Sequence, residues 1–114
     1  MPVRIRVEHM PQQAGTGWQE IILADSDRVG IPGIRLSHWK LDPGTAGPEQ
    51  CHRDAEGFLY VSRGGGMIWV NGSEWPLAPE TVIWLEPGDC YQIRSGKEGI
   101  EILYVAVQTS SLDA

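Results

Sequence analysis

The chain has 114 residues, which is enough for one domain with a single core. Hydrophobic residues make up 41% of it, and five tryptophans favour a packed globule over a disordered chain. Nine basic and fifteen acidic residues give a net charge of −6, which disfavours nucleic acids and anionic membranes as partners. No apolar run approaches the roughly 20 residues of a membrane span, and residues 1–9 lack a secretory signal's apolar core. We therefore expect a cytoplasmic protein.

Short strands are predicted along the whole chain, because 14 glycines and eight prolines interrupt it and no long 3.6-residue apolar period is present. In chain order the expected strands cover residues 3–7, 19–24, 34–41, 57–62, 66–70, 73–77, 81–86, 90–94 and 100–107. Asn71-Gly72 predicts a two-residue hairpin, because both residues tolerate positive φ. The pattern indicates one all-β domain over residues 1–114, as a sandwich, a jelly roll or a closed barrel.

The two cysteines, Cys51 and Cys90, are too few for a disulfide framework. We expect two reduced thiols, as is usual in the cytoplasm. A disulfide is the alternative, because both cysteines flank candidate site residues on segments that can approach each other.

Polar side chains gather in residues 47–61, directly before an apolar run. They are of types that bind metal ions or transfer protons, but that also occur on solvated loops: Gln50, His52, Asp54 and Glu56. Alternate residues of a strand face one side, so Gln50 and His52 are expected to point the same way. By the same alternation Asp54 falls beyond the site, and we expect it at the surface.

The spacing of these residues resembles the first of two motifs by which the cupins are recognised, G-x5-H-x-H-x3-4-E-x6-G. Read from its first glycine, the chain gives Gly44-x5-Gln50-x-His52-x3-Glu56-x7-Gly64. Glutamine replaces the first histidine, and one extra residue precedes the closing glycine. We expect a β-bulge at Gly57 to accommodate this extra residue.

The second cupin motif, G-x5-P-x-G-x2-H-x3-N, is similar to residues 80–95, ETVIWLEPGDCYQIRS. Gly88 is kept, while Tyr91 stands at the histidine position and Ser95 at the asparagine position. The predicted hairpin lies between the two motifs, as it should. The resemblance covers roughly residues 34–107, which leaves residues 1–33 as an N-terminal strand region.

The resemblance implies a conical barrel, a double-stranded β-helix or jelly roll, with a pocket between the motifs. In metal-bearing cupins the motifs supply three histidines and a glutamate to a divalent ion, and the matching positions here are Gln50, His52, Glu56 and Tyr91. Fewer imidazoles should lower the affinity for zinc, nickel or copper. Tyrosine binds well only as phenolate, which favours a strongly Lewis-acidic ion such as ferric iron. The choice among iron, manganese, nickel, zinc and copper stays open.

Each position also has a purely structural interpretation. Gln50 can line the barrel, His52 can be hydrogen-bonded at the pocket rim, and Glu56 can be solvated in its loop. Tyr91 can be a buried aromatic residue whose hydroxyl group finds a partner. His38 is a reserve ligand if its strand turns it inward. Most tryptophans on predicted strands are expected in the core or in dimer contacts, with one or two lining the pocket: Trp39, Trp69, Trp75 and Trp84.

Three functions are compatible with these features. The favoured one is a metal-dependent isomerase, lyase, cyclase or dioxygenase acting on a small organic molecule, with His52, Glu56 and Tyr91 as catalytic residues. A variant without metal uses His52 as base and Tyr91 as acid on opposite sides of the pocket, as in cupin-like sugar epimerases. The alternatives are a metal-free module that only binds a small molecule, and a purely structural dimer.

A homodimer is expected for each of these functions. Sheet edges need cover, and cupins commonly pair through N-terminal strands, here residues 3–7. The predicted partners are therefore a small-molecule ligand or substrate and a second copy of the chain.

Overall fold

The computed structural model describes residue 6 and residues 10–25 and 33–108 of the chain. The described residues form eight strands and no helix: β1 (Gln12–Gly15), β2 (Trp18–Asp25), β3 (Ile34–Leu41), β4 (Gln50–Cys51), β5 (Ala55–Val70), β6 (Ser73–Leu77), β7 (Val82–Leu85) and β8 (Cys90–Gln108). The expected strand over residues 3–7 lies outside the described residues, apart from Arg6. None of the described residues belong to a helix that could cross a membrane.

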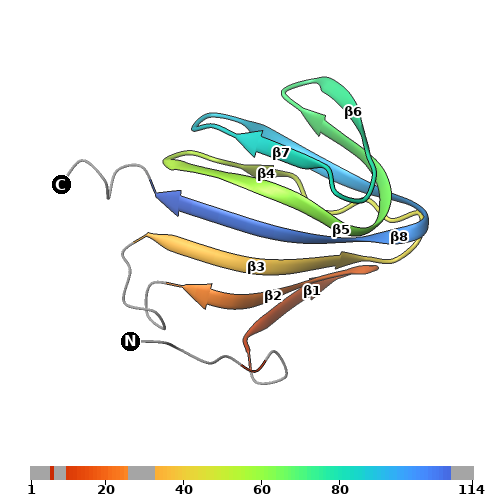
Figure 1. Cartoon of the computed structure of the whole chain (residues 1–114), viewed down its shortest axis with the longest axis horizontal. Coiled ribbons are helices and arrows are strands. Elements are labelled where there is room, and N and C mark those ends of the chain that lie inside the picture. Colours follow the sequence, from red (N-terminus) through yellow and green to blue (C-terminus); the bar gives the residue numbers. More distant parts are fainter. Residues whose placement is uncertain (1–5, 7–9, 26–32, 109–114) are drawn as a thin grey trace.

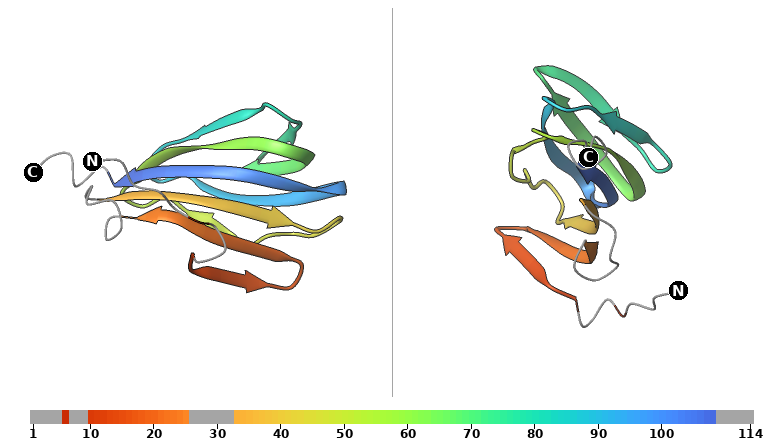
Figure 2. Two further views of the ribbon diagram at one scale, coloured as in Figure 1. Left: turned by 60° about the horizontal axis from the view of Figure 1, so that its bottom comes forward. Right: turned by 90° about the vertical axis from the view of Figure 1, so that its left-hand side faces the viewer.

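All the strand pairs are antiparallel, and they form one curved sheet in the order β1-β2-β3-β8-β5-β6. β4 adds to β8, and β7 adds to β5. The C-terminal part of β8 lies between β3 and the first part of β5, whereas its first part pairs with β4 and with the last part of β5. Figures 1 and 2 show how these two long strands carry the sheet around an interior.

The bend in β5 occurs at its run of glycines. The register against β8 shifts between Val61 and Arg63 and again between Gly64 and Gly66. Gly64 has φ +71°, which favours glycine. These register shifts accommodate the one residue that the chain has in excess of the first motif. The prediction of a bulge at Gly57 was therefore wrong.

Gly57 itself pairs in regular register with Ala106. A Cβ atom at this position would lie 2.0 Å from the carbonyl oxygen of Val105, so the close approach of β8 accounts for the glycine. The predicted hairpin is confirmed, because Asn71 and Gly72 have φ of 50° and 87° and join β5 to β6.

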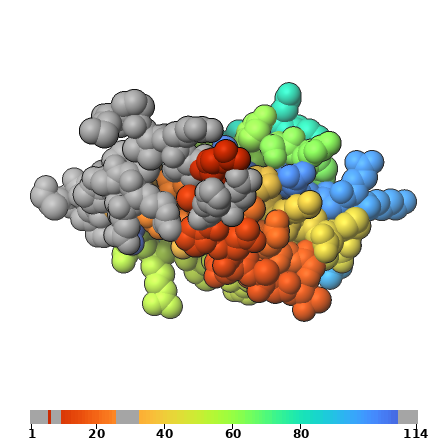
Figure 3. Space-filling view, turned by 90° about the horizontal axis from the view of Figure 1, so that it is seen from below, coloured from red at the N-terminus to blue at the C-terminus, as the bar shows by residue number. Residues whose placement is uncertain are grey.

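The core lies on the inner face of the sheet. Alternate residues of β3, β5 and β8 supply it, and the register places Trp39 beside Ile102 and Leu59 beside Tyr104. Trp75 and Trp84, which were expected in the core or in dimer contacts, are 45% and 56% exposed and lie at the surface of the single chain. β1 and β2, orange in Figure 3, form much of the face seen there, and every residue of β1 is exposed.

Candidate functional site

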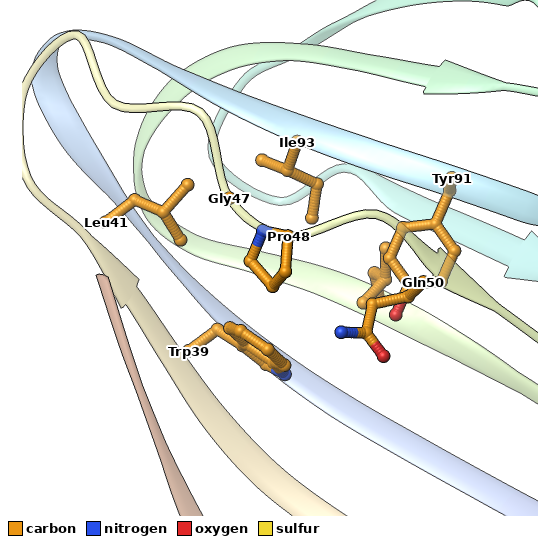
Figure 4. Close-up of a pocket in the computed structure, with 8 residues that line it drawn as sticks. Trp39, Leu41, Gly47, Pro48, Gln50, Tyr91 and Ile93 are labelled. Atoms are coloured by element: carbon orange, nitrogen blue, oxygen red, sulfur yellow. The ribbon is translucent and has the colours of Figure 1, made fainter. Parts of the chain in front are cut away.

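The inner face contains a mainly apolar pocket, which Figure 4 shows in close-up. Its walls include four apolar side chains and two polar ones: Trp39, Leu41, Leu59, Ile93, Gln50 and Tyr91. The loop that carries Gly47 and Pro48 runs across it. The free volume is about 10 Å³, which corresponds to about one water molecule. A larger ligand therefore requires side chains or the loop to move.

Ser95, at the asparagine position of the second motif, holds this loop in place. It is 3% exposed, and its hydroxyl group accepts a hydrogen bond from the Thr45 amide at 2.9 Å and donates to the Asp42 carbonyl. Gln92 lies on the same strand as Ser95, and its side-chain amide nitrogen Nε2 donates a hydrogen bond to the Gly47 carbonyl at 2.9 Å. The loop is thus fastened to β8 on one side of the pocket.

His52 lies in the barrel interior between two tyrosines. It follows β4 and is 4% exposed, and its backbone amide donates to the Asp89 carbonyl at 2.8 Å. Its Nε2 atom lies 2.7 Å from the hydroxyl oxygen of Tyr104. The rings of Tyr91 and Tyr104 meet the imidazole edge-on, with centroid distances of 5.8 and 5.6 Å. The three side chains form one buried cluster.

Burial keeps this cluster uncharged near neutral pH. It lowers the pKa of His52 below 6.5, while the Ala55 backbone and the Asp89 carboxylate act in the opposite direction. Burial also raises the pKa of Tyr104 to about 12 and raises that of Tyr91 further. The neutral imidazole is therefore a proton acceptor, and the two phenols keep their protons.

The lowered pKa of His52 predicts a pH-dependent stability. The unfolded chain protonates this histidine near pH 6.5, whereas the folded chain resists protonation until lower pH. Protons therefore favour the unfolded state, and the free energy of unfolding should fall by up to about 1 kcal/mol between about pH 7.5 and about pH 5.5. Urea unfolding at both values, with His52→Gln as the comparison, measures this contribution. An equal fall in the variant would contradict the lowered pKa.

The other predicted site residues are divided between two faces. Gln50 pairs with Tyr91 in register, so these two lie beside each other near His52. Glu56 pairs with Val107, whereas the next pair along, Gly57 and Ala106, faces the core. Antiparallel alternation therefore places the Glu56 side chain on the outer face of β5.

This donor set does not fit a metal ion. The described residues contain no group of three or more histidine, cysteine, aspartate or glutamate side chains placed to hold one. His52 Nε2 is engaged by Tyr104, and the raised pKa of Tyr91 disfavours the phenolate that binds metal. Gln50 alone is a weak neutral ligand.

Cys51 and Cys90 form a disulfide, which corrects the expectation of reduced thiols. They are register partners in the short β4–β8 ladder, with Cα atoms 4.0 Å apart. Because Gln50 and His52 flank Cys51 and Tyr91 follows Cys90, the bond ties together both segments of the site.

Four polar residues that were not predicted from the sequence also face the interior or its rim: Glu20, Arg35, Ser37 and Tyr104. Glu20 is 1% exposed and accepts hydrogen bonds from Arg35 Nη2 at 2.9 Å and from Gln13. Ser37 is fully buried and is the register partner of Tyr104. A lone carboxylate in the apolar run QEIILA was the one sequence signal for this group.

His38 does not join the site. Ser37 and Trp39 are directed into the core, so the residue between them is on the outer face, where its Nε2 atom lies 3.4 Å from a carboxylate oxygen of Glu101. The reserve role considered for His38 was wrong for this reason.

Comparison with known proteins identifies the family. The cupin domain model matches residues 37–106, more than half of the chain. The chain is a member of the cupin superfamily. The family match and the similar solved structures confirm the predicted fold class, an all-β jelly-roll barrel. No curated protein matches it.

Three solved structures illustrate the similarity. KdgF from Halomonas sp. is 16% identical, with TM-score 0.78 over 95% of this cupin and 94% of that chain. A predicted oxalate decarboxylase from Thermotoga maritima is 17% identical, with TM-score 0.79 over 93% and 99%. A sugar phosphate isomerase of the cupin superfamily from Silicibacter pomeroyi is 16% identical, with TM-score 0.77 over 94% and 76%. At these identities the likeness concerns the fold.

Proposed function

We propose that this cupin binds a small organic molecule in the barrel interior and transfers a proton on it without a metal ion. The observation that supports this proposal is the buried hydrogen bond between Tyr104 and the neutral imidazole of His52. A histidine of lowered pKa is neutral at neutral pH and can therefore accept a proton. The Tyr104 hydroxyl group, which is hydrogen-bonded to Nε2, can pass a proton from the substrate to this nitrogen.

The proton transfer proceeds through Tyr104. The Tyr104 oxygen accepts a proton from a carbon next to the substrate carbonyl group while its own hydroxyl proton moves to His52 Nε2. An enolate and an imidazolium result, and Tyr104 is neutral again. In a hydroxyketone, the proton of the neighbouring hydroxyl group moves to the enolate oxygen, and the abstracted proton returns from His52 through Tyr104 to the former carbonyl carbon, which gives the isomeric hydroxycarbonyl compound. The Asp89 carboxylate favours the transient imidazolium.

The choice of an isomerase rests on the acid–base pair. The sugar phosphate isomerase and the predicted oxalate decarboxylase share this fold, which is compatible with a small organic substrate. Two observations support the metal-free function over the metal-dependent one: strand alternation places Glu56 on the outer face, and burial raises the pKa of Tyr91.

A binding module without catalysis is the second candidate. The mainly apolar lining of the pocket favours it, because most of its walls can contact a ligand but cannot transfer a proton. In that case His52 and Tyr104 would serve as hydrogen-bonding groups only.

Deuterium exchange tests the proposal. Untagged, chelator-treated protein is incubated in D₂O with small hydroxyketones, and loss of the C–H signals next to the carbonyl group is followed by proton NMR. We expect exchange above the buffer rate, reduced by about 10²-fold or more in Tyr104→Phe and His52→Gln. Tyr60→Phe, on the outer face of β5, is the matched control and should exchange as the wild type does.

Two other results would contradict metal-free proton transfer. Exchange that appears only after addition of manganese, iron, nickel, zinc or copper would restore the metal-dependent function. Binding of a hydroxyketone with no exchange would favour the binding module. The homodimer and the cytoplasmic location stay predictions, which light scattering and cell fractionation can test.

A further inference from the structure

Two buried polar atoms on the inner face of β3 lack hydrogen-bond partners. They are Arg35 Nε and Ser37 Oγ, and neither has a partner within the part of the chain that the structure describes. Ser37 is fully buried, and the Nε atom is inaccessible although part of the Arg35 side chain reaches the surface. Buried polar atoms without partners are rare and commonly mark the place of a ligand or an ordered water.

These atoms lie beside the acid–base pair. Ser37 is the register partner of Tyr104, so their Cβ atoms are separated by about 5 Å. Arg35 precedes Ser37 by two residues on the same face, about 7 Å along the strand. Arg35 and Tyr104 are also close enough for the guanidinium charge to oppose part of the rise that burial causes in the pKa of Tyr104. Arg35, Ser37 and Tyr104 therefore lie close enough together for one compact molecule to contact all three once neighbouring side chains move aside.

The charge balance selects an uncharged molecule. The Arg35 guanidinium is already paired with Glu20 at 2.9 Å, and Glu20 is 1% exposed. A carboxylate bound at Arg35 would add a second negative charge next to this buried carboxylate, which has no other cationic partner among the described residues. A neutral oxygen avoids that cost and still satisfies the Nε–H donor.

The kinds of unsatisfied atom indicate the groups that such a molecule carries. Arg35 Nε can only donate, which calls for an acceptor such as a carbonyl oxygen. A serine hydroxyl donates and accepts, which suits a hydroxyl group. We propose that the interior beside β3 binds an uncharged small hydroxycarbonyl compound, its carbonyl oxygen at Arg35 Nε and a hydroxyl group at Ser37 Oγ. This names the substrate class for the proposed function and rests on it.

This placement has a consequence for the proton transfer. The carbonyl oxygen of the substrate would face a fixed N–H donor just as negative charge develops on it in the enolate. Donors of that kind stabilise the transition state more than the ground state. Arg35 would thereby contribute to the rate as well as to affinity.

Binding measurements test the proposal separately from catalysis. Amide spectra of ¹⁵N-labelled protein are titrated with dihydroxyacetone and with glycolate, which are similar in size and differ in charge. We expect dihydroxyacetone to bind at least about tenfold more tightly than glycolate, and Ser37→Ala to weaken its binding by about tenfold. Arg35→Lys keeps a cation beside Glu20 but removes the Nε–H donor, and it should weaken binding as well. Ser62→Ala and Arg63→Lys are the matched controls at exposed positions of β5.

Each outcome bears on the proposal. Tighter binding of glycolate, unchanged affinity in both β3 variants, or no spectral change with either compound would overturn it. Binding as expected without deuterium exchange would contradict the proton-transfer function and leave the ligand class intact. Exchange of hydroxyketones with an unchanged KM in Ser37→Ala and Arg35→Lys would contradict the proposed ligand contacts and leave the proton-transfer function intact.

Discussion

Replacement of Cys51 and Cys90 by alanine is expected to lower the free energy of unfolding by about 4 kcal/mol. The disulfide joins residues 39 apart in sequence, and closing a loop of that length removes considerable entropy from the unfolded chain. Its loss also leaves β4 held by a ladder of two residue pairs and by the backbone hydrogen bonds beside it, such as that from the His52 amide to the Asp89 carbonyl. Urea unfolding of the oxidised wild type and of the double variant measures the difference.

Reductant provides the internal control for this prediction. It should destabilise the wild type to the level of the double variant and leave the double variant unchanged. A difference below about 1 kcal/mol, or free thiols in the folded oxidised protein, would contradict the structural role of the bond. The amide signal of His52 should also move in the variant, because His52 directly follows Cys51.

Arg35→Leu is expected to cost about 3 kcal/mol of folding free energy. The change leaves the Glu20 carboxylate buried with the Gln13 side chain as its remaining described side-chain partner. A buried charge that loses its partner is far more costly than the absence of the pair. The free energy of unfolding in urea near pH 7 is the measurement.

A second variant separates charge from packing in this prediction. Glu20→Gln combined with Arg35→Leu removes both charges, and it should recover a large part of the lost stability. If the double variant were no more stable than Arg35→Leu alone, the buried charge would not explain the loss. Arg94→Leu, at an exposed position of β8, is the matched control.

Local sequence pattern predicted the regular parts of the fold well. Residues 34–41 form β3 with the predicted bounds, although their apolar positions change phase between Leu36 and Trp39. Asn71-Gly72 specified its hairpin by backbone preference alone. The two longest strands were predicted as separate pieces, because glycines that usually end strands here bend β5 while pairing continues. β1 carries no apolar alternation and could not be predicted.

The site was predictable only where residues are close in sequence. Motif spacing identified Gln50, His52 and Tyr91, which the structure places near one another. The face of Glu56 could not be predicted by counting, because the segment after His52 leaves the sheet before β5 begins and the alternation starts anew. Tyr104 and Ser37 reach the site from other strands, so tertiary pairing alone reveals them.

The protonation state of the His52 imidazole distinguishes a metal-free proton-transfer site from a metal centre. Long-range ¹H–¹⁵N spectra report the protonation and ligation of each ring nitrogen, and they can be recorded with and without added zinc. We predict a neutral ring that stays neutral below pH 6.5, whose Nε2 signal changes in Tyr104→Phe and is unmoved by zinc. Stoichiometric zinc binding that shifts the His52 signals would contradict a metal-free site and show a metal centre instead.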